Sequence, residues 1–413
     1  RSGLPDHAGD LLEDLGFTRA EILFRLRYQR PDSSFRSHYA YTNFGMTEGA
    51  VAAVKPYGLN WEEACQQKLY KPLGMTSTSS RYADFTARQN KAVGHVLVDG
   101  KWVQKFKRDP DAQSPTGGVS SSVNDVAKWI RLQLADGKFD GRQIVSEKPL
   151  TETHHPQMLT GFNPFTNMPT FYGLGWNVSY DEQGRLRLNH SGGFDLGAAT
   201  YVNLVPAEQL GIVVLTNGRP TGIAEALGTI FADIALYGKP TQDWFPLYKQ
   251  RFADPATTGT VLGFDYSKPP AAPASALKNS AYVGKYVNDF FGEIAVIEND
   301  GGLAILEGPK KLTFPLKHYD RDTFTYDTIG ENAVGRSGVT FTIGPDGQAT
   351  KVIVENLNVH GEGTFKRVST PESTPQSSVS EAASDKFSDL IDIGAGRADP
   401  AAEPTARIND DST

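Results

Sequence analysis

The chain has 413 residues, which is too long for one typical domain and predicts two folded units and a tail. Its hydrophobic content of 39% and charged content of 22% are ordinary for a globular protein. A net charge of -7 argues against a nucleic-acid partner, which would require a basic face or stripe. No stretch approaches the roughly 20 apolar residues of a membrane-spanning helix, and the single cysteine, Cys65, excludes an intrachain disulfide.

The first residues, Arg1-Ser2-Gly3-Leu4-Pro5, include no initiator Met and are typical of the interior of a domain. We therefore expect the sequence to be a fragment whose natural N-terminus, with any cleavable leader, lies upstream. The composition does not fix the compartment.

Two helix starts precede residue 135. Asn60-Trp61-Glu62-Glu63 has the pattern of a capping box, in which the Asn60 side chain accepts from a backbone N–H and Glu63 reaches back. It predicts a helix over residues 61–69. Ser122-Val123-Asn124-Asp125 has the same pattern and predicts a second helix, over residues 126–134, with one apolar face.

The sequence changes to a strand period after residue 200. Residues 201–204 and 212–215, separated by Pro206-Ala207-Glu208-Gln209, predict an antiparallel hairpin. A helical run over residues 223–236 is expected to cover one face of that sheet. Because helices and strands mix without regular βαβ alternation, the pattern favours the α+β class, an antiparallel sheet flanked by helices.

Two segments have the composition of a linker and a tail. Residues 251–279 contain prolines among Ala, Gly, Ser and Thr and are predicted to form a linker. Residues 369–413 are rich in Ser, Pro, Ala and acidic residues, a composition that predicts disorder.

Between these segments, residues 280–368 alternate in short runs with turn residues. Residues 294–297 and 303–306 flank Asn299-Asp300-Gly301-Gly302 and predict a hairpin, as do residues 339–343 and 351–354. Many short strands in under a hundred residues predict a small antiparallel β-barrel. A ligand could occupy its interior, but filling by its own side chains is the simpler interpretation.

Motifs spread over most of the chain resemble those of one enzyme family. Tyr41-Thr42-Asn43 is followed at long range by His190-Ser191-Gly192-Gly193. Further landmarks in the same order are Phe35-Arg36-Ser37-His38-Tyr39-Ala40, Pro72-Leu73-Gly74-Met75, Gly117-Gly118-Val119-Ser120-Ser121, Tyr172-Gly173-Leu174-Gly175-Trp176 and Leu215-Thr216-Asn217. Together they resemble the β-lactamase-related, penicillin-binding-protein-like serine hydrolases, a group with class C β-lactamases, D-aminopeptidases and carboxylesterases.

The resemblance implies a division into four segments. Residues 1–250 correspond to a catalytic domain that lacks its N-terminal part, and residues 251–279 to the linker. Tyr282-Val283-Gly284-Lys285-Tyr286 is similar to the start of the lipocalin-like domain that some members carry, which gives a barrel domain over residues 280–368. The tail is residues 369–413.

In the resembling family the nucleophile belongs to a Ser-x-x-Lys motif upstream of Tyr-x-Asn, and no such motif precedes Tyr41. Ser275-Ala276-Leu277-Lys278 matches the pattern, but we reject it because it follows both other motifs and lies in a predicted linker. Ser191 is also rejected, because no nearby motif supplies it with a base and oxyanion donors. We therefore expect the fragment itself to be inactive.

Tyr41 is the candidate catalytic base and later acid. A phenol has a pKa near 10, so work at neutral pH requires nearby positive charge. In the family that charge comes from the lysine of Ser-x-x-Lys and the cation of the late triplet. Asn43 is the candidate for orienting a substrate amide and the absent lysine. The alternative is a core aromatic at Tyr41 and a turn former at Asn43 before a helix.

His190 stands where β-lactamases usually have lysine. An imidazole carries only fractional charge at neutral pH and is a weaker anchor for a substrate carboxylate, which favours esterases and aminopeptidases over penicillin hydrolysis. The resemblance implies that the Gly193 N–H is one oxyanion donor. Gly192 lets substrate approach the backbone, and Ser191 is a candidate substrate-binding residue. The alternative is a surface histidine before a glycine turn.

The expected substrate is a small-molecule or peptide ester or amide, with D-residue peptides included and β-lactams less favoured. No cofactor is implied, and His154-His155 in an extended segment would point to opposite sides, which argues against a metal site. Two other hypotheses remain: a non-catalytic binding protein that keeps the fold, and a barrel that carries lipid or peptide. A homo-oligomer is left open, and so is the location, with a lean to the periplasm or secretion.

Overall fold

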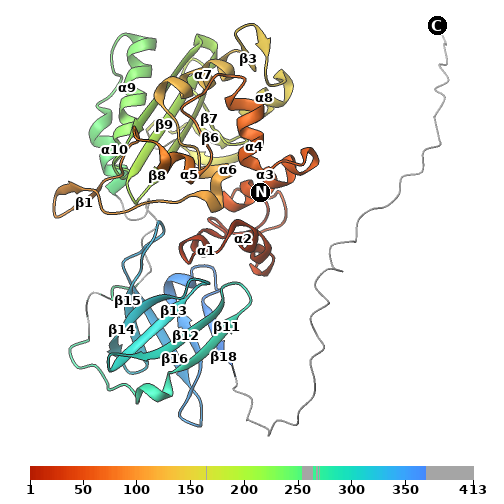
Figure 1. Cartoon of the computed structure of the whole chain (residues 1–413). Helices are drawn as coiled ribbons and strands as arrows, with labels where there is room; N and C mark the ends of the chain where they lie inside the picture. Colours follow the sequence, from red (N-terminus) through yellow and green to blue (C-terminus); the bar gives the residue numbers. More distant parts are fainter. Residues whose placement is uncertain (164, 254–263, 267, 269, 369–413) are drawn as a thin grey trace, which may run out of the picture. The chain divides into compact units, whose positions relative to one another are not determined.

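A six-stranded antiparallel sheet lies at the centre of the N-terminal part of the chain, which we call the sheet region (residues 1–253; Figure 1). The computed structural model describes residues 1–163, 165–253, 264–266, 268 and 270–368. The strand order is β10-β9-β8-β7-β6-β5. The strands are β5 Met158–Phe162, β6 Pro169–Tyr172, β7 Asn177–Tyr180, β8 Leu186–Phe194, β9 Ala198–Val205 and β10 Leu210–Thr216. The predicted hairpin is confirmed as the antiparallel pair β9–β10.

Two long helices cover opposite faces of this sheet. Successive side chains of a strand point to opposite faces, and β9 divides them accordingly. Val202 and Leu204 pack with α7 (Val123–Leu134), whereas the Tyr201 ring lies against Gly228 of α9 (Ile223–Tyr237). Strands enclosed by helices on both faces confirm the α+β prediction for this region.

The sheet region also contains shorter helices, of which α1 and α2 pack in one hydrophobic cluster with the barrel. They are α1 Asp10–Asp14, α2 Arg19–Arg25, α3 Asn43–Val54, α4 Trp61–Cys65, α5 Tyr82–Ala87, α6 Ser114–Gly117, α8 Glu147–His154 and α10 Trp244–Ala253. Two small hairpins, β1 Val96–Val98 with β2 Lys101–Val103 and β3 Lys138–Phe139 with β4 Arg142–Gln143, complete the regular structure of the sheet region.

The predicted helix starts differ in how fully they are confirmed. The Asn60 side chain accepts from Glu63 N–H and the Glu63 carboxylate accepts from Asn60 N–H, a complete capping box. The α-helix ends at Cys65 and continues as a π-helical turn, Gln66–Tyr70. Ser122 caps α7, but the helix begins three residues earlier than predicted, and the Asp125 carboxylate accepts from Ser77 N–H and the Thr78 hydroxyl instead of reaching back.

The C-terminal part is a closed antiparallel barrel of eight strands, which we call the barrel (Figure 1). Its strands are β11 Gly284–Asn288, β12 Gly292–Asn299, β13 Gly302–Glu307, β14 Leu312–Asp320, β15 Thr323–Asp327, β16 Arg336–Ile343, β17 Ala349–Val354 and β18 Thr364–Arg367. Pairing of β11 with β18 closes it. Both predicted hairpins are confirmed, as β12–β13 and β16–β17. Asp300 and Gly301 both have positive φ, as a tight two-residue hairpin turn requires.

Aromatic side chains fill the barrel interior. The largest of its fully buried side chains are Tyr282, Tyr286, Phe291 and Phe365. A cavity at one end, beside Glu307 and Tyr326, measures about 20 Å³, the space of a single water. The packing supports the interpretation of a self-filled interior over that of a lipid or peptide carrier.

The predicted linker overlaps the end of helix α10, which continues to Ala253. Its residues 254–263, 267 and 269, and the whole predicted tail, residues 369–413, lie outside the described residues. Ser275 and Lys278, the rejected Ser-x-x-Lys match, are both exposed. None of the described helices has both the length and the apolar character needed to cross a membrane.

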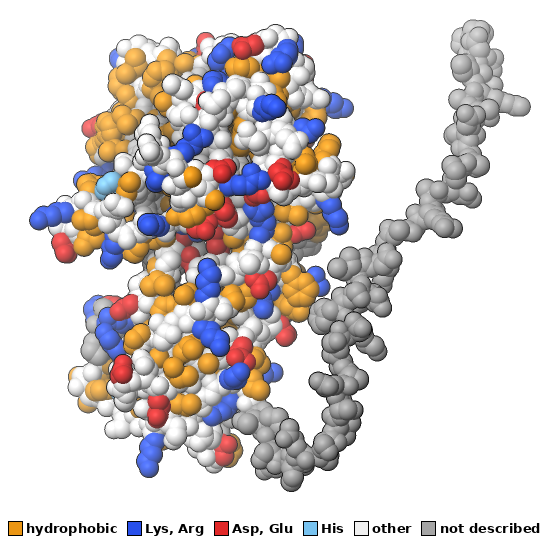
Figure 2. All heavy atoms as spheres, viewed as in Figure 1, with side chains coloured by type: hydrophobic (Ala, Val, Ile, Leu, Met, Phe, Trp, Pro, Cys, Tyr) orange, Lys and Arg blue, Asp and Glu red, His pale blue; other side chains and the backbone are white. Residues whose placement is uncertain are grey.

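The outer face of α9 carries an exposed apolar stripe. Ile223, Leu227, Phe231 and Ile234 recur at helical spacing and are each more than 40% exposed. Figure 2 shows hydrophobic side chains gathered over this helix, at the upper left. The stripe lies next to β10, which forms one edge of the sheet.

Candidate functional site

Tyr41 is held in place by its backbone at the start of α3. The Thr42 side chain caps this helix by accepting from Gly45 N–H at 3.0 Å. The Tyr41 carbonyl accepts from His7 N–H at 2.8 Å, and Tyr41 N–H donates to the Asp6 carboxylate. The N-terminal segment and the helix cap together fix the direction of the phenol.

The structure brings Tyr41 and His190 together, although 149 positions separate them in the sequence. Their ring centroids lie 6.3 Å apart. Tyr172, at the end of β6, contacts both, with centroids 6.4 Å from Tyr41 and 6.1 Å from His190. Tyr39 adds a fourth ring, 5.3 Å from Tyr172. We call these four residues the ring cluster.

Both nitrogens of the His190 ring are occupied. Nδ1 lies 2.6 Å from the Ser191 carbonyl oxygen, and Nε2 lies 2.9 Å from the Tyr172 hydroxyl. Burial lowers the pKa of His190, against a smaller opposing effect of the Ser191 carbonyl. The imidazole is therefore neutral at neutral pH. In the sequence Tyr172 is only a landmark, and its contact with His190 was not foreseen, because nothing local marks which strand end will face β8.

The Tyr41 hydroxyl has no hydrogen-bonding partner among the described residues, and burial raises the pKa of this phenol, with a smaller contribution from the Asp10 carboxylate. In this chain Tyr41 is a neutral acid. A base at this position would need the positive charge that the resembling family draws from other residues.

Asn43 points toward α1. Its Nδ2 donates to Asp10 Oδ2 at 3.1 Å, and His7 Nδ1 contacts the same oxygen at 3.0 Å. This contact with Asp10 raises the pKa of His7. The other Asp10 oxygen, Oδ1, is buried and has no partner among the described residues. One amide donor of Asn43 is thus already used within the protein, which the sequence did not indicate.

The residues after His190 divide between the two faces of β8. The Ser191 side chain lies beside the buried Glu225 of α9, on the face opposite His190. The structure therefore does not bring the Ser191 hydroxyl to the ring cluster. A Cβ on Gly192 would lie 2.5 Å from Thr200 Oγ1, and one on Gly193 would lie 2.7 Å from Pro220 Cγ. A side chain at Gly193 would therefore displace the Pro220 ring, whereas one at Gly192 would meet only the Thr200 hydroxyl, which can rotate away.

One edge of β8 is open beside the ring cluster. Strand β7 pairs with β8 only as far as Asn189, whereas β9 continues to pair up to Phe194. From His190 onward, among the described strands, β8 therefore has a strand neighbour on one side only. An extended ligand can pair with such an edge.

His154 and the tryptophans have structural roles. His154 is the last residue of α8, so the predicted extended segment is wrong, and its Nε2 donates to Gln133 Oε1 at 3.0 Å. Trp129 and Trp176 stack with centroids 5.6 Å apart inside the core, as predicted.

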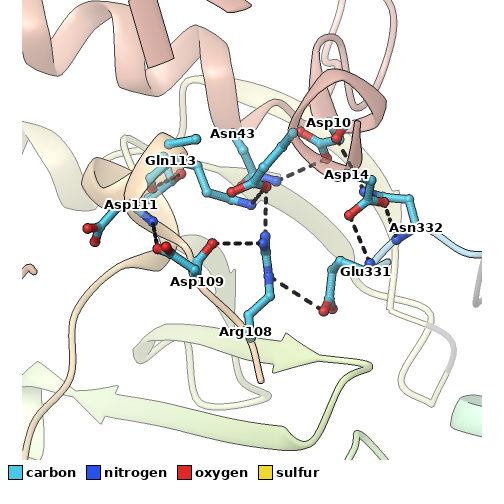
Figure 3. A network of polar contacts seen from close by, with 12 residues as sticks. Asp10, Asp14, Asn43, Arg108, Asp109, Asp111, Gln113, Glu331 and Asn332 are labelled. Atoms are coloured by element: carbon cyan, nitrogen blue, oxygen red, sulfur yellow. Dashed lines mark hydrogen bonds and ion pairs between the residues drawn. The ribbon is translucent and has the colours of Figure 1, made fainter. Parts of the chain in front are cut away.

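A loop of the barrel contacts the end of β8. Figure 3 shows its residues Glu331 and Asn332 facing Asp14, and Glu331 facing Arg108. Glu331, between β15 and β16, accepts from Asp195 N–H at 2.5 Å, one residue beyond β8. Asp14 of α1 accepts from the backbone N–H of Glu331 and Asn332, at 2.9 and 2.8 Å. Arg108 pairs with Glu13 at 2.7 Å and lies 3.6 Å from Glu331. Burial raises the pKa of Glu331 to about 7. No sequence pattern indicated this network, because its members lie far apart in the chain.

Comparisons with known proteins agree with this architecture. A family model described as beta-lactamase matches residues 1–235, and one for a domain of unknown function, DUF3471, matches residues 268–367. The chain is 24% identical over 376 residues to unguisins hydrolase ungD' of Aspergillus campestris, covering 85% of this chain and 68% of that protein. It is 24% identical over 208 residues to a beta-lactamase of Escherichia coli K12, covering 43% and 51%. The chain thus spans about half to two thirds of the length of these curated relatives.

Among solved structures, the octameric penicillin-binding protein homologue from Pyrococcus abyssi is similar, with a TM-score of 0.50 and 20% identity. The similarity covers 86% of this chain and 74% of that one and concerns the fold. The architecture is accordingly a β-lactamase/transpeptidase-like arrangement of helices and sheet, followed by a closed eight-stranded barrel.

Proposed function

The chain belongs to the beta-lactamase family, and from this premise we propose that it is part of a serine hydrolase that acts through an acyl-enzyme on small esters, amides or peptides. The observation that carries the proposal is the approach of Tyr41 and His190, with ring centroids 6.3 Å apart, beside the open edge of β8. The Tyr-x-Asn motif and the His-Ser-Gly-Gly motif thus lie side by side. The Tyr41 hydroxyl and the unpaired edge of β8 are both available there.

In the proposed reaction, the nucleophile is a serine from a Ser-x-x-Lys segment upstream of Arg1. Tyr41 takes the serine proton as the oxygen attacks the substrate carbonyl and gives it to the leaving group as the acyl-enzyme forms. Water then repeats the sequence and releases the acid. The Gly193 N–H and that of the nucleophile would stabilise the oxyanion.

Charge explains why the 413-residue chain should be inactive. The Tyr41 pKa is raised by burial and by the negative Asp10 carboxylate. An ammonium group beside the phenol would favour phenolate and reverse this shift. The proposal therefore puts the lysine of the upstream motif next to Tyr41, where it would turn a neutral acid into a base.

The relatives guide the substrate class. One is named for the hydrolysis of unguisins and another is a beta-lactamase, so amide bonds belong with esters among the proposed substrates. Peptides with D-residues are kept as candidates. The proposal needs no cofactor.

Two further expectations accompany the proposal. For the location of the protein, we favour export to the periplasm or secretion. Self-association is supported by the exposed apolar stripe on α9, since such patches mark interaction surfaces. Sedimentation of the chain at two concentrations would measure it.

The second candidate function is a non-catalytic binding protein that keeps the fold. It is favoured by the protonated state of Tyr41 and by the absence of a Ser-x-x-Lys motif before it in this sequence. The genomic sequence upstream of Arg1 separates the two candidates. A Ser-x-x-Lys motif there favours the enzyme, and a natural start codon at this position favours the binding protein.

The test uses p-nitrophenyl acetate and a fluorophosphonate probe. The 413-residue chain should release no burst of p-nitrophenol and should take up no label. A chain extended upstream to include Ser-x-x-Lys should give a stoichiometric burst and label at that serine. Labelling of Ser191 or Ser275 would overturn the assignment, and an extended chain without burst or label would remove the hydrolase proposal.

A further inference from the structure

Tyr172 occupies a position in the site that the family motifs do not explain. It lies at the end of β6, between Tyr39 and Tyr41 on one side and His190 on the other. Its hydroxyl contacts His190 Nε2 at 2.9 Å, which makes it the side chain that hydrogen-bonds the imidazole.

The two contacts of His190 determine where its proton lies. A carbonyl oxygen only accepts hydrogen bonds, so Nδ1, 2.6 Å from Ser191 O, carries the hydrogen. In a neutral ring the other nitrogen, Nε2, then has a lone pair and accepts. The Tyr172 hydroxyl is the donor to it, and burial, with the neighbouring Tyr41 and Tyr39, raises the pKa of Tyr172 and keeps its proton in place.

The surrounding charges do not favour an imidazolium. Two effects shift the pKa of His190: burial lowers it, and the hydrogen bond to the Ser191 carbonyl raises it. Burial is the larger effect, so the pKa is lowered. Burial raises the pKa of Tyr39 to about 12, so the phenols in the ring cluster are neutral. The acids that act on the cluster are Asp6, which accepts from Tyr41 N–H and acts on Tyr39, and Asp10, which acts on Tyr41. Glu225 lies on the opposite face of the sheet, beside Ser191.

We propose that Tyr172 is a positioning residue that holds His190 as a neutral, Nδ1-protonated imidazole, and that the site therefore accepts acyl groups without a negative charge. This inference rests on the proposed hydrolase function for its substrate class. A substrate carboxylate placed at His190 would find no free N–H on the imidazole, because both ring nitrogens are engaged. A neutral ester or amide has no negative charge that would need such a donor, so its binding beside His190 is not weakened.

The first test measures the tautomer directly in the 413-residue chain. Imidazole 15N NMR of the histidine-labelled protein distinguishes Nδ1–H from Nε2–H. His154 is an internal control with the opposite tautomer, because its Nε2 donates to Gln133 Oε1 and burial likewise lowers its pKa. We expect Nδ1–H at His190 and Nε2–H at His154. An Nε2–H tautomer, or a charged ring at neutral pH, at His190 would overturn the proposal.

The variant Tyr172→Phe tests the positioning role. Without the donor, the neutral form of His190 loses its hydrogen bond, so its pKa should rise and the Nε2–H form should become populated. Tyr180→Phe, at an exposed tyrosine on β7, is the matched control and should leave the His190 signals unchanged. Unchanged His154 signals in both variants report that the fold is intact. A Tyr172→Phe protein with unaltered His190 signals would contradict the proposal.

The second arm tests the substrate class in the upstream-extended chain. The kcat/KM of p-nitrophenyl butyrate is compared with that of the p-nitrophenyl monoester of succinic acid, whose acyl group carries a carboxylate. We expect a preference of about tenfold or more for the neutral ester, the worth of one charge-assisted hydrogen bond. Tyr172→Phe should narrow the preference below pH 6.5, where a released imidazole gains charge.

The two proposals fail in different ways. If neither ester is hydrolysed, the proposed hydrolase function is contradicted, while the NMR result still decides the protonation state of His190. If the unaltered protein hydrolyses both esters equally well, the proposed substrate class is contradicted and the proposed hydrolase function is retained.

Discussion

The barrel and the sheet region differ in how completely their backbone is paired. Pairing of β11 with β18 closes the barrel, so none of its strands is left as an edge. The sheet of the sheet region ends at β10 and β5, and β8 loses its β7 partner after Asn189. Unpaired strand edges attract other chains or ligands. The comparison therefore supports the proposed ligand site in the sheet region.

Buried polar groups do not show the same contrast, because unpaired ones occur among the described residues of both regions, among them Asp10 Oδ1 in the sheet region and Glu355 Oε2 and Glu362 Oε1 in the barrel. Inside the barrel, the Tyr326 hydroxyl donates to Asn356 Oδ1 at 2.7 Å and contacts Glu307, and the Ser337 hydroxyl donates to the same Asn356 oxygen. In the sheet region, the Tyr41 hydroxyl and Asp10 Oδ1 have no hydrogen-bonding partner among the described residues. The Tyr41 hydroxyl is not one of these buried atoms, so it is open to an incoming group, as the role proposed for this residue requires.

The largest expected effect concerns the open hydroxyl of Tyr41. In the upstream-extended chain, Tyr41→Phe should lower kcat by about 10²- to 10⁴-fold, because it removes general acid–base catalysis. Tyr57→Phe, an exposed tyrosine outside the ring cluster, is the control and should keep full activity. Steady-state turnover of an activated ester measures both. Unchanged turnover in Tyr41→Phe would take this residue out of the mechanism.

The next effect concerns the filled barrel interior. The Phe365 side chain is fully buried, and its ring centroid lies 6.1 Å from that of Phe291. Because its removal leaves a cavity, Phe365→Ala should lower the free energy of unfolding by about 3 to 5 kcal/mol. Phe35→Ala, at an exposed position, should change it by less than about 0.5 kcal/mol. Urea titration followed by circular dichroism gives both values. A small loss at Phe365 would indicate a loosely packed interior and would reopen the carrier hypothesis.

Two buried carboxyl groups lie in the C-terminal part of the chain, Glu307 inside the barrel and Glu331 in the loop that contacts the sheet region. Burial raises the pKa of Glu307 in the barrel and of Glu331 at the end of β8 to about 7, from an ordinary value near 4.5. Between these values the folded state binds more protons than the unfolded state, so stability should fall as pH rises from about 4.5 to 7. Each group contributes roughly 3 kcal/mol, at about 1.4 kcal/mol per pKa unit.

Isosteric amides separate the two contributions. Glu307→Gln should flatten the pH dependence of barrel unfolding, because an amide oxygen can still accept from Tyr326. Glu331→Gln should remove the part of the pH dependence of unfolding that comes from the contact with Asp195. This part should be the smaller one, because Arg108 pairs with Glu331 and partly offsets the cost of its ionisation. Urea unfolding at pH 5 and pH 7.5 checks both variants. A slope that persists in the double variant would exclude these two carboxyl groups as its source.

The smallest effect compares two glycines. Gly193→Ala should destabilise the chain by about 1 to 3 kcal/mol, because the new Cβ would lie 2.7 Å from Pro220 Cγ. Gly49→Ala, in helix α3 with open space around it, should stabilise by about 0.5 to 1 kcal/mol. Thermal unfolding of the two variants gives the sign of each change. Two changes of the same sign would mean that Pro220 moves aside.

Local patterns predicted the elements that depend on neighbouring residues. The capping box at Asn60 and the Asn299–Gly302 turn are set by side chains and φ angles within four residues, and both are present. The prediction failed where local signals competed. Asp125 was expected to close a capping box but bonds Ser77 and Thr78, since its carboxylate is one methylene shorter than that of a glutamate and finds donors across the fold.

For the site, the sequence by itself determined the residue types: a tyrosine before a helix cap, a histidine followed by two glycines, and the order of both motifs along the chain. The tertiary structure alone decided that Tyr172 bonds His190, that Asn43 bonds Asp10, that Ser191 turns to Glu225 and that a barrel loop places Glu331 at the end of β8. The physical reason is that protonation and contact depend on burial and on partners far away in the chain. The spacing of residues in a motif predicts neither the burial of a side chain nor its distant partners.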